Sequence, residues 1–204
     1  MRRKTFDALL TTGGLVVAVV LAVAGALLGW GHNFAQSNVH NQLAKQQIFF
    51  PPKAAFDNAK PGTEITPSMI PTVSQYAGQQ LLTGAQAKVY ADDFIGAHLA
   101  EMPYGGVYAK VSAAAMADPN NQALAAEKQT TFQGTTLRGM LLNAYAFSKM
   151  ADIAGIASLV SYIGAGVMLL LAGLGLIHTV RTKPDAELIS WLTDQNVKEP
   201  ARVS

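Results

Sequence analysis

The residues of this sequence that could bind a metal ion lie around His98. Glu101 follows His98 by three residues, and Asp92 and Asp93 precede it by one to two helical turns. Side chains three apart share a helix face, so His98 and Glu101 could hold a metal ion together. A competent site needs about three protein ligands, and His40 would have to complete it. The alternative is a solvated helix face, which we favour because such polar pairs are ordinary surface features.

Other chemical motifs are absent from the sequence. It has no glycine-rich phosphate loop, no HExxH and no GxSxG, and Gly105-Gly106 is more typical of a turn than of a phosphate cradle. It has no cysteine, which excludes disulfides, thiolate metal sites and cysteine nucleophiles. A net charge of +2 gives no electrostatic reason to expect nucleic acid as a partner. We therefore predict no cofactor and no enzymatic activity.

Composition instead indicates a membrane protein. Half of the 204 residues are hydrophobic and 14% are charged, against roughly 25% charged in soluble domains. Two apolar segments, residues 8–31 and 153–180, each exceed the ~20 residues that a transmembrane helix needs. The first follows the basic start MRRK and could instead be a signal peptide. Its apolar run is longer than the usual ~7–15 residues and closes with Trp30, so we favour an uncleaved anchor.

Basic residues beside the two segments predict their orientation. Arg2, Arg3 and Lys4 precede the first segment, and Arg181 and Lys183 follow the second, whereas residues 33–152 carry eight basic and eight acidic residues. The positive-inside rule then places both termini in the cytoplasm of a plasma-membrane protein. The expected order is a cytoplasmic N-terminus (1–7), a span (8–31), an extracytoplasmic domain (32–152), a span (153–180) and a cytoplasmic tail (181–204).

Three finer predictions concern the membrane segments and the tail. The spans contain no Asp, Glu, Lys or Arg, which argues against an ion pathway through this chain alone. Small residues recur at four-residue spacing in both, with Gly25 and Gly29 as a GxxxG pair, which indicates either a hairpin of the two spans or association with other membrane helices. The set is Ala18, Ala22, Ala26, Gly25, Gly29, Ala157, Ser161 and Ala165. In the tail, residues 188–192 predict one amphipathic turn on the inner membrane surface.

The domain between the spans is predicted to be all helical. The first helix continues from the membrane with Val39, Leu43, Gln46 and Phe50 on one face, and is expected to stop at Pro51-Pro52. Five prolines make residues 49–72 a proline-rich irregular loop, for which packed and mobile forms both remain open.

Helical signals return after the proline-rich loop. Thr83 and Gln86 fit a capping box before a helix that reaches Leu99 and breaks at Pro103. Shorter helices are expected at 108–117 and 121–132, with a boundary at Gly134, and then one long helix over 135–179. The fold class is therefore an all-α membrane protein whose two transmembrane helices extend into a helical extracytoplasmic bundle. Lys149 and Asp152 are expected to form an ion pair at its membrane side.

Three segments resemble a family of small actinobacterial membrane proteins: VHNQLAKQQIFFPP, QYAGQQLLTGAQAKVYADDFIGAHL and GTTLRGMLLNAYAFSKM. The resemblance covers nearly the whole chain and implies a two-span protein of the cell envelope, of unassigned function. Some members carry the label of aromatic ring-opening dioxygenase. Such an enzyme needs two histidines and a carboxylate around a metal ion, and His40 and His98 lie in no matching motif. No catalytic residue is therefore carried over.

The function that follows is a non-enzymatic accessory or scaffolding component of a cell-envelope or membrane complex. Its expected partners are membrane lipid and either other membrane or envelope proteins or further copies of itself. One alternative is an extracytoplasmic ligand sensor that signals through a partner, with the proline-rich loop over a pocket between helices. A second alternative is a metal-dependent enzyme that uses His98 and Glu101.

Overall fold

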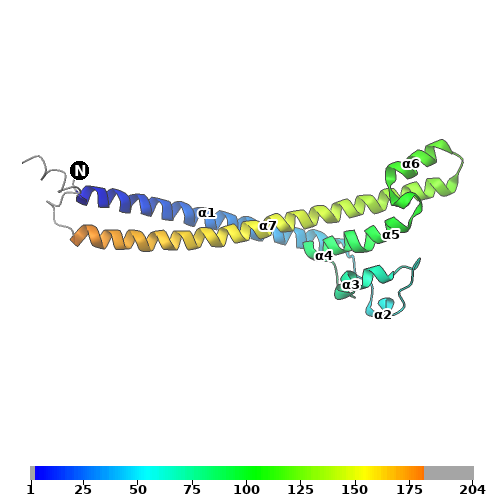
Figure 1. Ribbon diagram of the computed structural model, residues 1–204, viewed down its shortest axis with the longest axis horizontal. Coiled ribbons are helices and arrows are strands. Elements are labelled where there is room, and N and C mark those ends of the chain that lie inside the picture. Colours follow the sequence, from blue (N-terminus) through cyan, green and yellow to red (C-terminus); the bar gives the residue numbers. More distant parts are fainter. Residues whose placement is uncertain (1–2, 182–204) are drawn as a thin grey trace, which may run out of the picture. The chain divides into compact units, whose positions relative to one another are not determined.

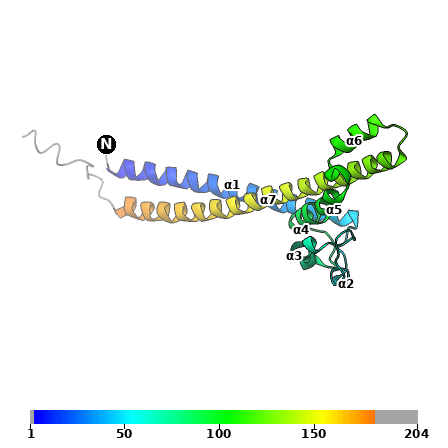
Figure 2. The same cartoon turned by 45° about the vertical axis from the view of Figure 1, so that its right-hand side comes forward.

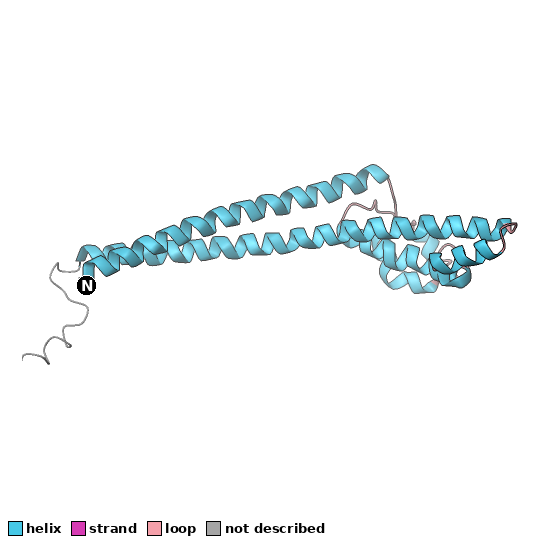
Figure 3. Ribbon diagram, turned by 90° about the horizontal axis from the view of Figure 1, so that it is seen from above, coloured by secondary structure: helices cyan, strands magenta, loops and turns pink. Residues whose placement is uncertain are grey.

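Every regular element of the protein is a helix, as Figure 3 shows for the part of the chain that is described. The structure is a computed structural model that describes residues 3–181. Within that range no strand is formed, and the only β-type pairing is an isolated antiparallel bridge between Phe49 and Gln80. The all-helical prediction is therefore confirmed for these residues. The predicted amphipathic turn at 188–192, and the tail after Arg181, lie outside the described residues.

The chain divides into two compact units, which are described separately. One consists of residues 3–29 together with residues 155–181, and is called here the apolar helix pair. The other, residues 30–154, is called the helical domain. The two long helices α1 (Arg3–Gln46) and α7 (Gln122–Arg181) contribute to both units (Figure 1).

In the apolar helix pair, α1 and α7 run side by side, as Figures 1 and 2 both show. Each helix is long and apolar enough to cross a membrane by length and composition. Only 11% of the most apolar 18-residue stretch of each helix is buried. The side chains that do not face the partner helix, such as Leu10 and Leu170, are therefore left largely exposed.

The core of the helical domain lies where the long helices meet a third helix. That helix runs from Gly84 to Glu101 in three parts: α4 (Gly84–Val89), a π-helical turn η3 (Tyr90–Ile95) and α5 (Gly96–Glu101). It buries Ala87, Ala91 and Ile95 against α1 and α7. The core as a whole consists of Val39, Leu43, Phe50, Phe56, Ile65, Met69, Val73, Leu81, Ala87, Ala91, Ile95 and Leu141.

The capping box predicted at the start of this helix is present. The Gln86 backbone N–H donates to the Thr83 side-chain oxygen at 3.2 Å, and Gln86 Oε1 accepts from the Thr83 backbone N–H at 3.0 Å. Gln86 Oε1 also accepts from the Leu82 N–H at 2.8 Å. Gln86 is buried, so these bonds satisfy backbone donors that water cannot easily reach.

The proline-rich loop is packed rather than free. It contains the short helices α2 (Lys53–Phe56) and η1 (Pro67–Met69) and runs into α3 (Ile70–Val73), which η2 (Ser74–Tyr76) follows. Its apolar residues Phe50, Phe56, Ile65 and Met69 all enter the core. The Phe50 ring lies 5.3 Å from Tyr90 and 5.1 Å from Tyr76, measured between ring centroids. The prolines therefore shape a chain path that the core fixes in place.

Two predicted helix ends differ from the structure. α1 ends at Gln46, four residues before Phe50, because Gln47 takes a left-handed backbone conformation with φ 52°. The predicted boundary at Gly134 is wrong, since α7 runs through it without a break. A Cβ on Gly134 would lie 3.0 Å from the Leu99 side chain. This glycine therefore serves close packing of Leu99 on α7 rather than a turn.

The remaining connection of the helical domain leads from the end of α5 to the start of α7. Pro103 begins the turn η4 (Pro103–Gly106), in which Tyr104, Gly105 and Gly106 all have positive φ. A Cβ on Gly106 would lie 2.2 Å from the Leu99 carbonyl oxygen, so only glycine fits there. α6 (Tyr108–Ala117) has the bounds that the sequence predicted, and Tyr108 lies 5.7 Å from Phe132 on α7 between ring centroids.

Candidate functional site

The contact inside the apolar helix pair is made by small residues spaced seven apart. α1 buries Thr11, Ala18 and Gly25, and α7 buries Ser158, Ala165 and Ala172. Seven residues make nearly two helical turns, so each set lines one face. Small side chains allow the two backbones to approach closely and gain van der Waals contact. The observed period is therefore seven residues, whereas the sequence predicted packing at four-residue spacing.

The predicted packing residues take three kinds of position in this contact. Ala18, Gly25 and Ala165 are buried, whereas Ala22, Gly29, Ala157 and Ser161 are half-buried and Ala26 is exposed. In the GxxxG pair, a Cβ on Gly25 would lie 3.2 Å from the Tyr162 ring, and one on Gly29 would lie 3.0 Å from Ser158 Oγ. The absence of side chains at these two glycines therefore leaves space for Tyr162 and Ser158 of α7. Ala26 faces away and takes no part in the contact.

Ser158 makes a hydrogen bond between the two helices. Its hydroxyl donates to the Gly25 carbonyl oxygen at 2.7 Å, and both groups are buried. The hydroxyls of Ser161 and Thr11 instead donate to carbonyls of their own helices, at 2.8 Å each. At the other end of the pair, His178 Nε2 lies 3.7 Å from Asp7 Oδ2.

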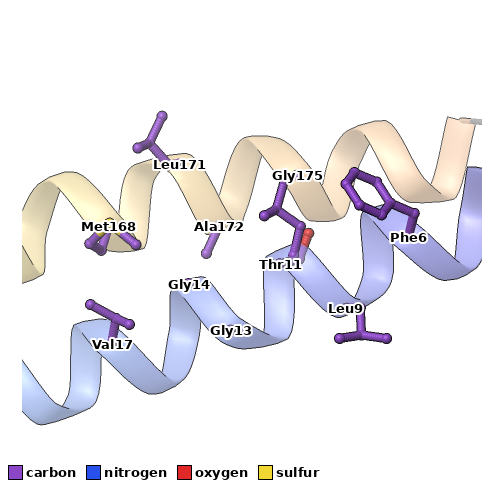
Figure 4. Close-up of a pocket in the computed structure, with 11 residues that line it drawn as sticks. Phe6, Leu9, Thr11, Gly13, Gly14, Val17, Met168, Leu171, Ala172 and Gly175 are labelled. Carbon is purple, nitrogen blue, oxygen red and sulfur yellow. The ribbon is translucent and has the colours of Figure 1, made fainter.

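The apolar helix pair also carries an open groove of about 860 Å³ (Figure 4). It is lined by Phe6, Leu9, Leu10, Thr11, Gly13, Gly14, Val17, Met168, Leu171, Ala172 and Gly175. The one hydroxyl among them, that of Thr11, is held by the Asp7 carbonyl. The groove therefore offers hydrocarbon surface to a ligand and lacks polar groups that could orient one.

The candidate metal ligands are not brought together. His98 Nδ1 donates to the Phe94 carbonyl oxygen at 2.8 Å, and its ring meets the Phe94 ring edge-on at 4.7 Å between centroids. Glu101 is exposed. His40 lies on α1 in a shallow depression that Leu82 and Thr83 also line, without His98. Within residues 3–181 no group of three or more His, Asp or Glu side chains could hold a metal ion.

Asp92, next to these residues, forms a structural ion-pair cluster. Its carboxylate accepts from Lys88 Nζ at 2.5 Å and from Arg138 Nη2 at 2.9 Å, so it joins the π-helical turn to α7. The hydrogen bond from Lys88 holds the pKa of Asp92 below its ordinary value of 3.8, and the bond from Arg138 adds to that effect. A carboxylate held ionised in this way positions a helix and is a poor proton donor.

A second polar cluster joins α1 to α7 within the helical domain. Gln36 Nε2 donates to Asp152 Oδ1 at 2.7 Å, and Ser148 Oγ donates to Gln36 Oε1 at 3.1 Å. His32 Nδ1 donates to the Ala151 carbonyl oxygen at 2.7 Å. The predicted pair of Lys149 and Asp152 is present, at 3.1 Å. These side chains fix the register of the two helices against each other.

On the helical domain, α1 and α7 form a further groove of about 450 Å³, called here the amide groove. Phe34, Met140 and Phe147 border it and are each 58–60% exposed. Asn38, Gln42 and Gln46 line it at intervals of four residues, and no side-chain hydrogen bond engages them within residues 3–181. The other lining residues are Ala35, Val39, Leu43 and Ala144. The groove was not predicted from the sequence, in which only the amides four residues apart on α1 were visible.

Comparison with known proteins adds no relative. No family model, no curated protein and no solved structure matches the chain. The resemblance to small actinobacterial membrane proteins stays a prediction. The candidate sites are therefore judged on their own geometry: a closely packed apolar helix pair and an uncharged groove on a helical domain.

Proposed function

We propose that this protein spans the plasma membrane twice, with both termini in the cytoplasm and the helical domain outside. The supporting observation is that the apolar stretches of α1 and α7 are only 11% buried. A core helix of a soluble protein would be mostly buried. In water, each leucine or valine left exposed loses the roughly 1.5–3 kcal/mol of free energy that its burial would contribute. In hydrocarbon the same side chain is well solvated. A bilayer around the helix pair removes that cost.

Its role in this proposal is that of a non-enzymatic accessory or scaffolding component of a membrane or cell-envelope complex. The amide groove is the observation that carries the role. It leaves large apolar side chains and unengaged amides open on a folded domain, which is the pattern of a surface used for binding. His98 and Asp92, whose side chains could in principle take part in catalysis or metal binding, are instead engaged in contacts that stabilise the fold.

The ligand-sensing alternative rests on the same groove. Its volume of about 450 Å³ falls within the range of about 300–1,000 Å³ that small-molecule sites occupy. The proline-rich loop does not cover it, because no residue of 49–72 lines the groove. A sensor would therefore have to bind its ligand in an open groove rather than in one closed by a lid.

The orientation can be tested by thiol labelling, because the chain contains no cysteine of its own. Lys128→Cys places a thiol in the helical domain, and Ser204→Cys places one at the end of the tail. A membrane-impermeant maleimide should label the first in intact cells and the second only after permeabilisation. The reverse order, or equal labelling of both variants, would contradict the proposed orientation.

The role can be tested by purification from native membranes in mild detergent, followed by quantitative identification of bound proteins. We expect a reproducible set of membrane or envelope proteins at near-equal amounts to the tagged chain. A second preparation with Phe34→Ala and Phe147→Ala should lose them, whereas Met116→Ala, exposed on α6, should retain them. Recovery of the tagged chain alone, as a monomer, would count against the scaffolding role.

A further inference from the structure

An acidic and a basic side chain meet at the end of the apolar helix pair where α1 begins and α7 ends. His178 Nε2 lies 3.7 Å from Asp7 Oδ2. Asp7 is the only acidic residue of α1, and His178 is the only histidine of α7. The Asp7 side chain is 18% exposed and that of His178 is 57% exposed. The histidine is therefore open to protons from solution, whereas the carboxylate is largely shielded from water.

Close packing holds Asp7 beside α7. Its backbone carbonyl oxygen accepts from the Thr11 hydroxyl at 2.8 Å, and a Cβ on Gly175 would lie 2.5 Å from Thr11 Oγ1. Gly175 precedes His178 by three residues, so the two residues share a face of α7. The contact between Thr11 and Gly175 thus brings Asp7 and His178 together about one turn nearer the helix ends.

The Asp7 carboxylate depends on a positive partner in this position. Its Oδ2 atom is buried, and no hydrogen bond reaches that atom within residues 3–181. A carboxylate oxygen that is removed from water without a hydrogen bond or a counter-charge is costly. The His178 imidazole supplies a counter-charge at 3.7 Å when it is protonated, and it supplies none when it is neutral.

We propose that Asp7 and His178 form a proton-dependent closure of this end of the apolar helix pair. Histidine changes its charge between about pH 5 and pH 8. Protonation of His178 draws the ends of α1 and α7 together. Loss of that proton leaves Asp7 without the counter-charge and lets the two ends separate. Stronger acid, which protonates the Asp7 carboxylate itself, removes the attraction again, so the closure is tightest at mildly acid pH.

Other charges near this end set the strength of the attraction but do not give it this pH dependence. The other ionisable side chains near it in sequence are Arg2, Arg3, Lys4, Arg181, Lys183, Asp185 and Glu187. Arginine and lysine stay positive, and carboxylates of ordinary pKa stay negative, from about pH 5 to pH 8. Of these side chains and the pair itself, the imidazole is the group that changes its charge within that range.

This inference rests on the proposed function for one point, that the closing end lies in the cytoplasm and responds to cytoplasmic pH. The two proposals fail separately. The closure is measured on purified protein, without regard to orientation or to other proteins. A reversed orientation would leave the closure intact and place it outside the cell. A pair that ignores pH in a correctly oriented protein would remove this inference alone.

Spin labels at Thr5→Cys and Val180→Cys test the closure, because the chain has no cysteine of its own. Both positions are exposed, Val180 to 80%. The full-length chain is placed in nanodiscs of phosphatidylcholine, which has no net charge and so replaces neither partner. Pulsed electron paramagnetic resonance should show a longer-distance population at pH 8 that is at least twice the one at pH 6. An unchanged distance distribution would overturn the proposal.

Variants of the pair separate a proton switch from a merely structural contact. His178→Gln should give the same distribution at both pH values. His32→Gln should retain the response, since the His32 ring bonds the Ala151 carbonyl in the helical domain. His178→Lys keeps its positive charge and should hold the short distance at pH 8, and adding Asp7→Asn should release it. A response that persists in His178→Gln, or a His178→Lys variant that opens at pH 8, would refute the role of this pair.

Discussion

Ser158 on α7 donates a hydrogen bond of 2.7 Å to the backbone carbonyl oxygen of Gly25 on α1. The bond is possible because small residues at this contact let the two helix backbones approach closely. A Cβ at position 25 would already lie 3.2 Å from the Tyr162 ring. Seven-residue spacing of small residues on both helices brings these two groups together.

The variant Ser158→Ala should therefore weaken the helix pair. The loss expected for a hydrogen bond between membrane helices is about 0.6–2 kcal/mol. Ser161→Ala is the matched control, because the Ser161 hydroxyl bonds the Ala157 carbonyl of its own helix. Unfolding of both variants in mixed detergent micelles, followed by circular dichroism, gives the two free energies. Equal losses for the two variants would show that the Gly25 contact contributes nothing specific.

Two glycines of the helical domain should respond to alanine in opposite directions. A Cβ on Gly84 would lie 2.3 Å from Ser148 Cβ and 3.2 Å from Tyr145 Cα, so α4 would have to move away from α7. Gly84→Ala should cost about 1–3 kcal/mol of the free energy of unfolding. Gly139 lies within α7 with nothing within 4 Å of its Cβ position. Gly139→Ala should add about 0.5–1 kcal/mol, and thermal unfolding distinguishes the two.

Acid should weaken the contact between the π-helical turn and α7. The pKa of Asp92 is lowered in the folded protein, chiefly by the hydrogen bond from Lys88. A lowered folded pKa means that Asp92 contributes stability above its unfolded pKa of 3.8. That contribution disappears as the pH falls through the lower folded value. Asp92→Asn should therefore flatten the acid part of the stability profile. By NMR titration, Lys88→Gln should raise the Asp92 pKa more than Arg138→Gln; the opposite order would contradict this assignment.

His98 should affect stability rather than metal content. Its Nδ1 is committed to the Phe94 carbonyl and its ring packs on the Phe94 ring. Purified protein should contain no stoichiometric transition metal, and His98→Ala should lower the unfolding temperature without changing the metal analysis. A bound metal ion that is lost in the His98→Ala variant would instead support the hypothesis of a metal-dependent enzyme.

Local patterns in the sequence predicted local structure well. The capping box at Thr83 and the bounds of α6 depend on neighbouring residues, and both are present. Gly134 was misread because a helical glycine is a break by propensity, whereas its actual role depends on Leu99, which is distant in sequence. No sequence pattern predicted the π-helical turn at Tyr90–Ile95. The turn occurs together with long-range contacts, those of Asp92 with Arg138 and of Ala91 and Ile95 with the core.

The candidate sites were harder to predict than the fold. Alanine and glycine are frequent in apolar helices, so their spacing alone could not identify the face that packs. The structure selects it, with Ala18 and Ala165 buried and Ala26 exposed. The amide groove requires two helix segments about 100 residues apart in sequence, those of Gln42 and Phe147. The periodicity of residues within one segment cannot predict which other segment packs beside it.

The composition of the amide groove has a consequence for the conditions under which it can work. None of its lining residues is ionisable. Attraction between charged surfaces falls with ionic strength, since the Debye length shrinks to about 3 Å at 1 M salt. Contacts made by amides and aromatic rings are not weakened by this screening. On the proposed outer side of the membrane, where salinity and acidity follow the surroundings rather than the cell, this surface would bind with nearly constant strength.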